Sequence, residues 1–566
     1  MSFYEESSIV ITPNAYKAGT LYAINPASGL ADMDVTRATA ATRVDESGLV
    51  NYAEVIEDSI LTGNNSTFDT GIGSWVTYNG GTLAHSTDKL EVTLTSGESG
   101  ARINTNSLIS GGQSGKTFKV RARIWKGTST NSTIAIFIGG AQKFITISPT
   151  PTYFEAELTA TNTSMLTIYR AGGGGGVGTY FIDDVTVKQV DRDNVPRIDY
   201  TGGGCPHILA EPQRTNLFDY SEDFSNWNIF RSSLTPNQAI SPDGTLNADL
   251  VEQDYPNTSV HGGLNNPTGV TTGVEYTYSF FVKKKEYSWI ELAEAATSAS
   301  NVSTWFDVEN GVVGNIGSGS TAQIEDFGNG WYRCSISFTS VYTGSRNFVL
   351  YLSKANGSST ADIVGGIYIY GAQLEEGSYP TSYIPTSGTA VTRNQDQFSR
   401  DGISSLINST EGCVFGEGNF AESNSSSYNY FVSLSDGTSS NRLEVRQSSP
   451  NLQFLWRVAT YQSEISTSSL DVSSNFKFAL NYSAANIKFY VNGDLIGTIN
   501  TPTLWSVNTL NRLAFDDGTG GNRLSGKVKQ LQVYPTALTD EQLIELTGVT
   551  YSSYLAMANA LNYTIQ

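Results

Sequence analysis

The stretch FKFALNYSAANIKFYVNGDLIGTI, residues 476–499, decides the fold class. Apolar and polar residues alternate on both sides of Asn492-Gly493, so successive side chains would point to opposite faces of two strands. An Asn-Gly pair between alternating runs is the strongest short signal for a hairpin, because its tight turn needs positive φ angles. The stretch therefore predicts a β-hairpin.

The composition extends this prediction to the whole chain of 566 residues. Charged residues make up 16%, below the roughly 25% usual for soluble proteins, while aromatic residues reach 11% and glycines number 55. Gly, Ser, Thr and Asn interleaved with Tyr, Phe, Val and Ile favour strands and turns over helices. The length indicates several domains of about 100 to 200 residues each. We expect an all-β, multidomain protein.

Two blocks, residues 58–190 and 216–395, look like divergent copies of one plan. Each opens with an aromatic segment, continues with an alternating strand that a glycine introduces, and closes with another long strand. Repeated strands of this length predict tandem jelly-roll β-sandwiches. The alternating strands are GKTFKVRARIWKG (115–127) and GVEYTYSFFVKKK (273–285), and the closing strands are GTYFIDDVTVKQV (178–190) and GGIYIYGAQLEEG (365–377).

The alternation in residues 115–127 assigns side chains to the two faces of that strand. One face would carry Lys119, Arg121 and Arg123. The other would carry the apolar residues Phe118, Val120, Ala122 and Ile124 and so face the core.

The N-x-F…W opening of the first block and its closing YFIDDVTV resemble carbohydrate-binding modules of the galactose-binding-like superfamily. The resemblance implies a structural calcium held by an acidic residue of the last strand, here Asp183 or Asp184, and carboxylate oxygens suit Ca²⁺. Exposed strand carboxylates without a metal are the alternative. Tyr370 and Gly371 stand at these positions in the second block, so the calcium prediction does not extend there.

Residues 396–548 predict a third sandwich. The string NRLAFDDGTGGNRLSGKVKQLQVYPTALTDEQLIELTG (511–548) reads as a strand, a Gly-rich loop, a strand and a short helix capped by Thr539 and Gln542. With FYVNGDLIGTI (489–499), it resembles concanavalin A-like, or laminin-G-like, lectin domains. The resemblance implies a concanavalin A-like sandwich with a ligand site at its rim.

Four aromatic residues are candidates for glycan binding, because the apolar face of a pyranose stacks on a ring while polar groups take the hydroxyls. Trp125 lies at the end of an alternating strand. Its ring could either pack in the core or stay exposed as a platform for a sugar, and the sequence leaves both alternatives open. Trp456, Tyr461 and Trp505 would lie near the rim of the lectin-like sandwich.

The Gly-rich loop near the same rim adds three polar candidates. Asp516 and Asp517 are predicted metal ligands, and Asn522 is a predicted glycan contact. A solvated loop without a ligand is the alternative.

Three further strings resemble bacteriophage virion structural proteins. In such proteins a segment like ATRV (41–44) often runs soon into the second string, so residues 58–190 read as an insertion into a discontinuous base domain, 1–57 plus 191–215. The resemblance implies a tail fibre, spike or head decoration acting as a homotrimer. The strings are SIVITPNAYKAGTLYAINP (8–26), NVPRIDYTGGGCPHILAEPQRTNL (194–217) and IYIYGAQLEEGSYPTSYIPTSG (367–388).

Charge and sequence pattern exclude several classes. A net charge of −20 and a pI near 4.6 argue against a nucleic-acid partner, which needs clustered cations. Three scattered cysteines exclude a disulfide framework. The first residues lack the pattern of a signal peptide and no 18-residue apolar run occurs, so we expect no membrane insertion, synthesis in the host cytoplasm and location in the virion.

No catalytic constellation is evident. His85, His207 and His261 form no metal-binding spacing, and no G-x-S-x-G elbow occurs. A pair of carboxylates can suffice for glycoside hydrolysis, so an enzyme stays an alternative. We therefore expect a non-enzymatic virion protein that displays sandwiches for host-surface glycans alongside other virion proteins. The alternative is a polysaccharide-degrading enzyme or its accessory arm. The tail, 549–566, is predicted to form a short helix.

Overall fold

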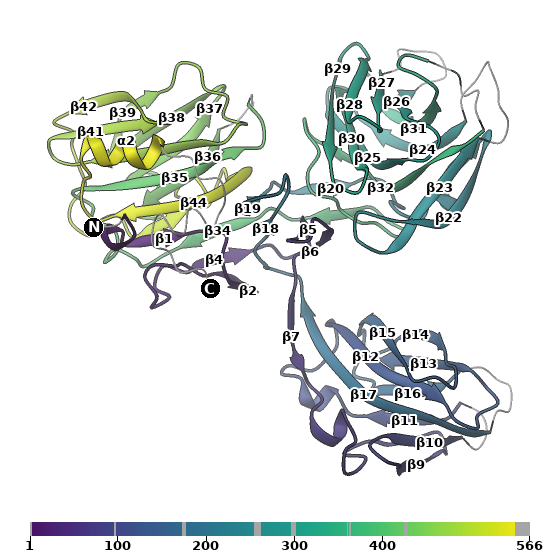
Figure 1. The fold of residues 1–566 in the computed structure, drawn as a ribbon. Helices are drawn as coiled ribbons and strands as arrows, with labels where there is room; N and C mark the ends of the chain where they lie inside the picture. The colour runs from purple at the N-terminus through teal and green to yellow at the C-terminus, as the bar shows by residue number, and fades with distance from the viewer. Residues whose placement is uncertain are drawn as a thin grey trace. The chain divides into compact units, whose positions relative to one another are not determined.

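The computed structural model describes residues 3–94, 98–171, 177–253, 262–295, 302–358, 360, 364–423 and 428–548. The predicted tail, 549–566, lies outside them. Apart from the helices α1 (Phe3–Glu6) and α2 (Asp540–Gly548) and three 3-10 turns, every element in these ranges is a strand (Figure 1). The predicted all-β, multidomain class is therefore confirmed. No helix within the described ranges is long and apolar enough to cross a membrane.

The chain forms two compact units, Glu54–Arg192 and Met1–Ala53 with Asp193–Gln566. The first, here called the inserted unit, interrupts the second close to the predicted boundaries of 58 and 190. Its two sheets enclose one core, and β12 places Phe118, Val120, Ala122 and Ile124 in it as predicted. One sheet contains β7 (Val55–Ser59), β9 (Thr82–His85), β10 (Leu90–Leu94), β12 (Thr117–Lys126), β15 (Thr152–Thr159) and β17 (Gly178–Asp191). The other contains β8 (Val76–Tyr78), β11 (Gly100–Ile103), β13 (Thr133–Ile138), β14 (Ala141–Thr146) and β16 (Leu166–Arg170).

Residues 216–395, here called the second module, repeat this plan with two sheets around an aromatic core. Trp227 packs in that core as Trp75 does in the inserted unit, and each indole N–H donates to a backbone carbonyl. One sheet contains β21 (Asn228–Phe230), β24 (Gly263–Val270), β26 (Trp289–Ala295), β27 (Val302–Asp307), β28 (Val312–Ile316) and β31 (Gly344–Ser353). The other contains β22 (Ser232–Ile240), β23 (Leu246–Gln253), β25 (Glu275–Lys284), β29 (Ser320–Asp326), β30 (Trp331–Thr339) and β32 (Gly366–Glu376).

The C-terminal sandwich has two large sheets. The predicted turn joins β41 to β42, with φ of 51° at Asn492 and 92° at Gly493. Thr539 and Gln542 make the predicted capping box of α2, with bonds of 2.9 and 3.3 Å. One sheet contains β1 (Ile9–Ile11), β18 (Ile198–Asp199), β19 (His207–Ala210), β35 (Gly412–Phe420), β40 (Phe476–Tyr482), β41 (Asn486–Val491), β42 (Asp494–Asn500) and β44 (Gly526–Tyr534). The other contains β2 (Tyr16–Lys17), β3 (Thr20–Leu21), β4 (Met33–Thr36), β34 (Gln397–Arg400), β36 (Asn429–Ser435), β37 (Arg442–Ser448), β38 (Asn451–Val458), β39 (Thr460–Ser466) and β43 (Arg512–Ala514).

The separate base domain expected from 1–57 plus 191–215 is not what the strand pairing shows. β1 and β19 both pair with β44, and β4 pairs with β34, so the base strands extend the two sheets of the C-terminal sandwich. β1 and β19 lie along the same edge of β44, because β35 pairs with its other edge. Ile9, Ile11 and Ile208 lie in the core of that sandwich, which explains why they join it rather than form a domain of their own.

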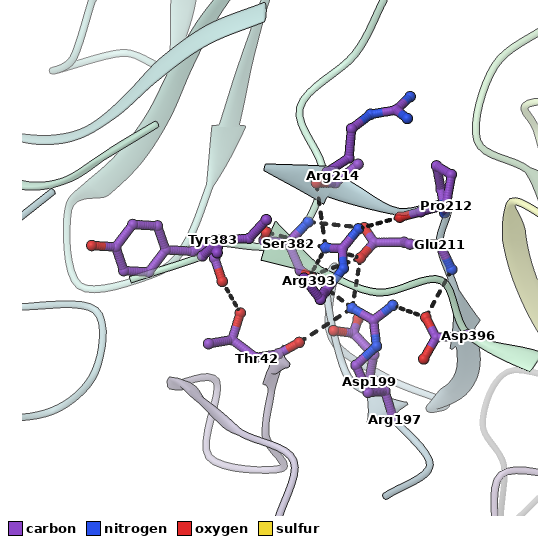
Figure 2. Close-up of polar contacts among 12 residues, drawn as sticks. Thr42, Arg197, Asp199, Glu211, Pro212, Arg214, Ser382, Tyr383, Arg393 and Asp396 are labelled. Carbon is purple, nitrogen blue, oxygen red and sulfur yellow. Dashed lines mark hydrogen bonds and ion pairs between the residues drawn. The ribbon is translucent and has the colours of Figure 1, made fainter. Parts of the chain in front are cut away.

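Two of the strings that resemble virion proteins, 194–217 and 367–388, meet Arg393 and Asp396 in a buried ion cluster (Figure 2). Arg197 pairs with Glu211 at 2.6 Å and with Asp396, while Arg393 reaches Glu211 at 2.7 Å. Ser382 Oγ donates to Glu211 at 2.7 Å and accepts from both arginines. These residues come from two distant segments, 197–211 and 382–396, so the cluster fastens the base strands to the end of the second module and the start of the C-terminal sandwich.

The cluster also fixes the charge state of its carboxylates. Burial alone would raise the pKa of Glu211, but the charges of Arg393 and Arg197 outweigh it and lower that pKa well below its usual range. Burial would also raise the pKa of Asp396, but the charges of Arg197 and Arg37 outweigh it, so that pKa is lowered too. Arg37 contacts Asp396 at 2.8 Å.

The two small sheets beside the cluster contain β5 (Thr42–Val44) with β6 (Val50–Tyr52), and β20 (Arg214–Asn216) with β33 (Val391–Arg393).

Candidate functional site

A β-bulge in the inserted unit shapes the candidate site. Along β12 and β17, Arg121 lies opposite Thr186 but Arg123 lies opposite Asp183, so β17 has one extra residue there. Asp184 has a φ of 47°, a left-handed conformation that is uncommon outside glycine. Bulges of this kind redirect side chains, and this one turns both aspartates toward the outer face of the sheet.

Charged groups meet at this bulge. Arg123 forms an ion pair with Asp183, and its Nε lies 3.5 Å from an oxygen of Asp184. The hydroxyl of Tyr153 donates to Asp184 at 2.6 Å. Burial raises the pKa of Asp183, and the bonds from the Asp184 N–H and from Arg123 oppose this only in part. Burial would lower the pKa of Arg123, but Asp183 outweighs it and raises that pKa.

A cavity of about 450 Å³ opens beside the bulge. The half-buried ring of Trp125 lines it, 5.4 Å from Phe181 and 5.7 Å from the guanidinium of Arg123. Trp125 is therefore an aromatic wall of a cavity rather than a core residue. The other lining residues are Thr67, Asp69, Thr87, Asp88, Lys89, Arg123, Asp183 and Asp184.

The backbone around this cavity is strained. Phe68, Thr87, Asp88 and Asp184 all have positive φ, between 46° and 56°. Each such residue costs on the order of 1 kcal/mol and persists only where the surrounding structure imposes it, which happens most often at binding sites. Thr87, Asp88 and Asp184 line the cavity, and Phe68 lies between two lining residues, Thr67 and Asp69, so strained backbone is concentrated at this cavity.

The aspartates of the bulge do not fit a calcium ion. Arg123 already neutralises Asp183, and the Asp184 backbone N–H donates to it at 2.8 Å. Ca²⁺ needs six to eight oxygen ligands, whereas the described residues contain no group of three or more His, Cys, Asp or Glu side chains that could hold a metal. The donor set here favours hydrogen bonds to hydroxyl groups instead.

Two aromatic candidates of the C-terminal sandwich are core residues. Trp456 and Trp505 are only 2% and 4% exposed, and their indole N–H groups donate to Thr503 O and Arg457 O. Neither can offer a ring face to a sugar, so both are withdrawn as glycan contacts. Tyr461, on β39, is 48% exposed.

The Gly-rich loop uses its own carboxylates to hold its shape. Asp517 accepts from the N–H and hydroxyl of Thr519 and from Asn522 at 2.7 to 3.0 Å, and Asp516 accepts from Arg512 at 3.0 Å. These bonds leave Asp516 and Asp517 poorly suited to a cation, while Asn522 is an exposed member of the loop.

Sequence reasoning missed Arg123, Lys89 and Tyr153 as site residues. The alternation in 115–127 placed Arg123 on the outer face but gave no sign of the bulge that brings Asp183 to it. Lys89 and Tyr153 come from a turn and another strand, so only the fold brings them near.

Comparisons with known proteins support the fold of the C-terminal sandwich. Residues 419–544 match a family model described as the concanavalin A-like lectin/glucanases superfamily. No curated protein matches the chain. The predicted concanavalin A-like sandwich is therefore confirmed.

Several solved structures are similar to parts of the chain. The Ruminococcus gnavus IT-sialidase CBM40 bound to alpha2,3 sialyllactose is 18% identical over 25% of this chain and 83% of its own, with a TM-score of 0.22. A heptameric SAP-like pentraxin from Limulus polyphemus is 18% identical over 24% and 70%, with a TM-score of 0.21. The CBM22 tandem of Paenibacillus barcinonensis Xyn10C is 12% identical over 57% and 98%, with a TM-score of 0.21. These scores are too low to transfer any property to this chain.

Proposed function

We propose that this chain is a non-enzymatic glycan-binding protein of a bacteriophage virion and that the inserted unit binds a host-surface glycan at the Trp125 cavity. One observation carries the binding site: a half-buried tryptophan lines a cavity that also contains the ion pair of Arg123 with Asp183. A pyranose would stack on the indole, and its hydroxyls would bond to Arg123, Lys89 and the aspartates.

The cavity favours a neutral glycan over an acidic one. Its lining contains four carboxylates, Asp69, Asp88, Asp183 and Asp184, against two cations, Arg123 and Lys89. A sugar carboxylate would meet a surplus of like charge, whereas neutral hydroxyls can both donate to carboxylates and accept from cations.

The virion assignment rests on the resemblance of residues 8–26, 194–217 and 367–388 to phage structural proteins. In this proposal three copies form a homotrimer, as the resemblance to phage fibres implies, and the trimer assembles with other virion proteins. Linking several weak sites in one assembly raises the avidity for the glycan. Mass spectrometry of purified virions should detect the chain, and native mass measurement should give three times 61.0 kDa. Virions without the chain would contradict the assignment, and another copy number would contradict only the trimer.

A glycan array with matched arginine variants tests the site. Arg123→Gln removes a cavity cation and should weaken glycan binding by about tenfold, since a hydrogen bond to a charged group contributes about 1.5–3 kcal/mol. Arg121→Gln, two residues away on the same strand but outside the cavity lining, should leave binding within about twofold. Equal losses would contradict the site. Release of oligosaccharides from the bound glycan would instead favour the polysaccharide-degrading alternative.

A further inference from the structure

Side chains from two sandwiches line one cavity of about 520 Å³ in the larger of the two units. In the C-terminal sandwich, the strand register places Leu209 of β19 beside Lys527 of β44. In the second module, it places Glu325 of β29, Arg333 of β30 and Phe281 of β25 in one row. All five residues line the cavity, which we call the junction cavity.

The wall of the junction cavity is held in place by bonds within the chain. β5 and the segment 379–383 complete this wall, and Thr42 Oγ1 donates to the backbone carbonyl of Tyr383. Arg333 donates to the backbone carbonyl of Thr381 at 2.6 Å. Gln323, another lining residue, is exposed, so the cavity is open to solvent. A preformed cavity whose volume falls within roughly 300–1,000 Å³ is typical of small-molecule sites.

Most charged groups of this wall have partners inside the protein. Asp199 accepts from the backbone N–H groups of Val44 and Thr201, each at 2.9 Å, and contacts His207 Nε2 at 3.0 Å. These groups shape the wall and are not available to a ligand. The other charged lining residues with partners are Glu211, Arg333 and Glu422.

Three charged groups of the wall differ from these. Within the part of the chain that the structure describes, Arg43, Glu325 and Lys527 make no hydrogen bond and no ion pair, although each is partly buried. Burial raises the pKa of Glu325, and the charges of Lys527 and Arg333 oppose this only in part. The carboxylate of Glu325 would therefore gain from a cationic partner.

The three groups specify the charges of a ligand. Taking a charged group out of water without pairing it is costly, so a molecule that fills the cavity must offer acceptors to Arg43 and Lys527 and a donor to Glu325. A simple anion would meet Glu325, and a simple cation would meet the other two. A zwitterion pairs with all three, and its ionised groups form stronger hydrogen bonds than sugar hydroxyls do.

The remainder of the wall contains apolar side chains. Val44, Val50 and Leu209 lie together with Phe327 in the lining. An apolar group that packs against them is removed from water, which favours binding. The wall thus combines three unpaired charges with an apolar part.

We propose that the junction cavity binds a small zwitterionic amino compound with an apolar side chain, either a free amino acid or a short peptide. Its carboxylate pairs with Lys527 and Arg43, its ammonium group pairs with Glu325, and its side chain packs against the apolar part of the wall. The junction cavity and the Trp125 cavity belong to different units, and the proposal does not depend on glycan binding.

Calorimetric titration of the full chain at neutral pH tests the proposal. The probes are leucine and phenylalanine for a free amino acid, and dileucine and trileucine for a peptide. We expect at least one of them to bind with a dissociation constant of about 1 mM or lower. N-acetylation of that probe, or conversion of its carboxylate to the amide, should each weaken binding at least about tenfold, because each removes one charge. Absence of binding by all four probes, or equal binding of either derivative, would overturn the proposal.

Matched lysine variants on β44 locate the site. Lys527→Gln should weaken binding of the best probe about tenfold and remove the preference for its free carboxylate over the amide. Lys529→Gln, two residues along the same strand and outside the cavity lining, should leave binding within about twofold. Equal losses in the two variants would contradict the site.

Glu325→Gln tests the other end of the ligand. It keeps the size of the side chain and removes its charge, so it should remove the preference for the free ammonium group over the acetylated probe. Thermal unfolding should not change, because Glu325 has no ion pair in the described part of the chain. Trp125→Ala should leave binding of the probe unchanged. A preference for the ammonium group that survives Glu325→Gln, or binding that is lost with Trp125→Ala, would contradict the assignment.

Discussion

The inserted unit and the second module have the same β-bulge at the same place, yet they use it differently. In the inserted unit the extra residue follows Asp183 on β17, and in the second module it follows Tyr370 on β32. Asp184 and Gly371 occupy equivalent positions with φ of 47° and 58°. The shared register shows that the two blocks are copies of one plan.

The residues around the two bulges differ in kind. The first has Arg123, Asp183 and an open cavity. At the second, Phe281 replaces the arginine and Tyr370 the aspartate, and Tyr383 from the following segment covers them. Tyr383 Oη contacts Ser221 at 2.7 Å and Glu222 at 3.0 Å. One copy therefore leaves this face open as a cavity, while the other uses the same face to anchor its own chain.

The largest expected effect is the loss of Tyr383. Its side chain is 2% exposed, so Tyr383→Ala should destabilise the second module by about 3–5 kcal/mol. Trp125→Ala in the inserted unit is the matched change and should cost only about 1 kcal/mol, because that ring is only partly buried. Hydrogen exchange in β32 and β17 measures the two effects. Equal protection losses would remove the distinction between a covered and an open face.

Breaking the ion cluster should cost nearly as much. Asp396→Asn leaves Arg37 and Arg197 without their shared carboxylate and should destabilise the larger unit by about 3 kcal/mol or more. The pKa values of Asp396 and Glu211 are lowered in the folded protein, so it binds fewer protons than the unfolded chain. The stabilisation is therefore present above about pH 4 and is lost as the pH falls further.

Denaturant unfolding between pH 3 and 7 checks this account of the cluster. The wild type should lose stability steeply on acidification, and Asp396→Asn should show a shallower slope. Asp401→Asn, at an exposed ion pair with Arg512, is the control and should change little. Parallel pH slopes for the wild type and Asp396→Asn would contradict the assigned role.

Exchange of the two bulge residues should have a smaller, asymmetric effect. In Gly371→Asp, the new Cβ would lie 2.9 Å from Phe281 Cδ2 and 3.2 Å from Tyr383 Cε2, at a positive φ, so about 1–3 kcal/mol should be lost. Asp184→Gly relieves the positive φ and loses the bond from Tyr153 and a half-exposed contact with Arg123, so it should change stability by less than about 1 kcal/mol. A costlier Asp184→Gly would show that the bulges are not equivalent.

Calcium removal should have the smallest effect. The carboxylates predicted as ligands, Asp183, Asp184, Asp516 and Asp517, already have cationic or N–H partners, or a tyrosine hydroxyl. Chelation should therefore shift the unfolding temperature by no more than about 1 °C. A rise of about 5 °C or more on adding calcium would show a bound ion, because saturating binding contributes several kcal/mol.

Local patterns in the sequence predicted the features that depend on neighbouring residues. The alternation of β12, the Asn492-Gly493 turn and the Thr539 capping box each need only a few consecutive residues. The role of Trp456 and Trp505 depends on which sheet covers them, and no local signal distinguishes a rim aromatic from a core one.

Long-range pairing explains the other errors. The base strands join the C-terminal sandwich because Ile9 pairs with Val533, a partner at the opposite end of the chain. Likewise, Arg123 meets Asp183 only through strand register and a bulge. Residue types along the chain indicated the fold class and several site residues, but not which charges would meet.

Glycan binding by Trp125→Ala and Lys283→Ala, compared with wild type, tests the central claim most directly. Lys283 pairs with Tyr368 as Trp125 pairs with Phe181, so it is the equivalent residue of the second module. The open-face account predicts that Trp125→Ala weakens binding to the neutral glycan found on the array by about tenfold or more and that Lys283→Ala leaves it unchanged. Undiminished binding by Trp125→Ala, or an equal loss with Lys283→Ala, would contradict it.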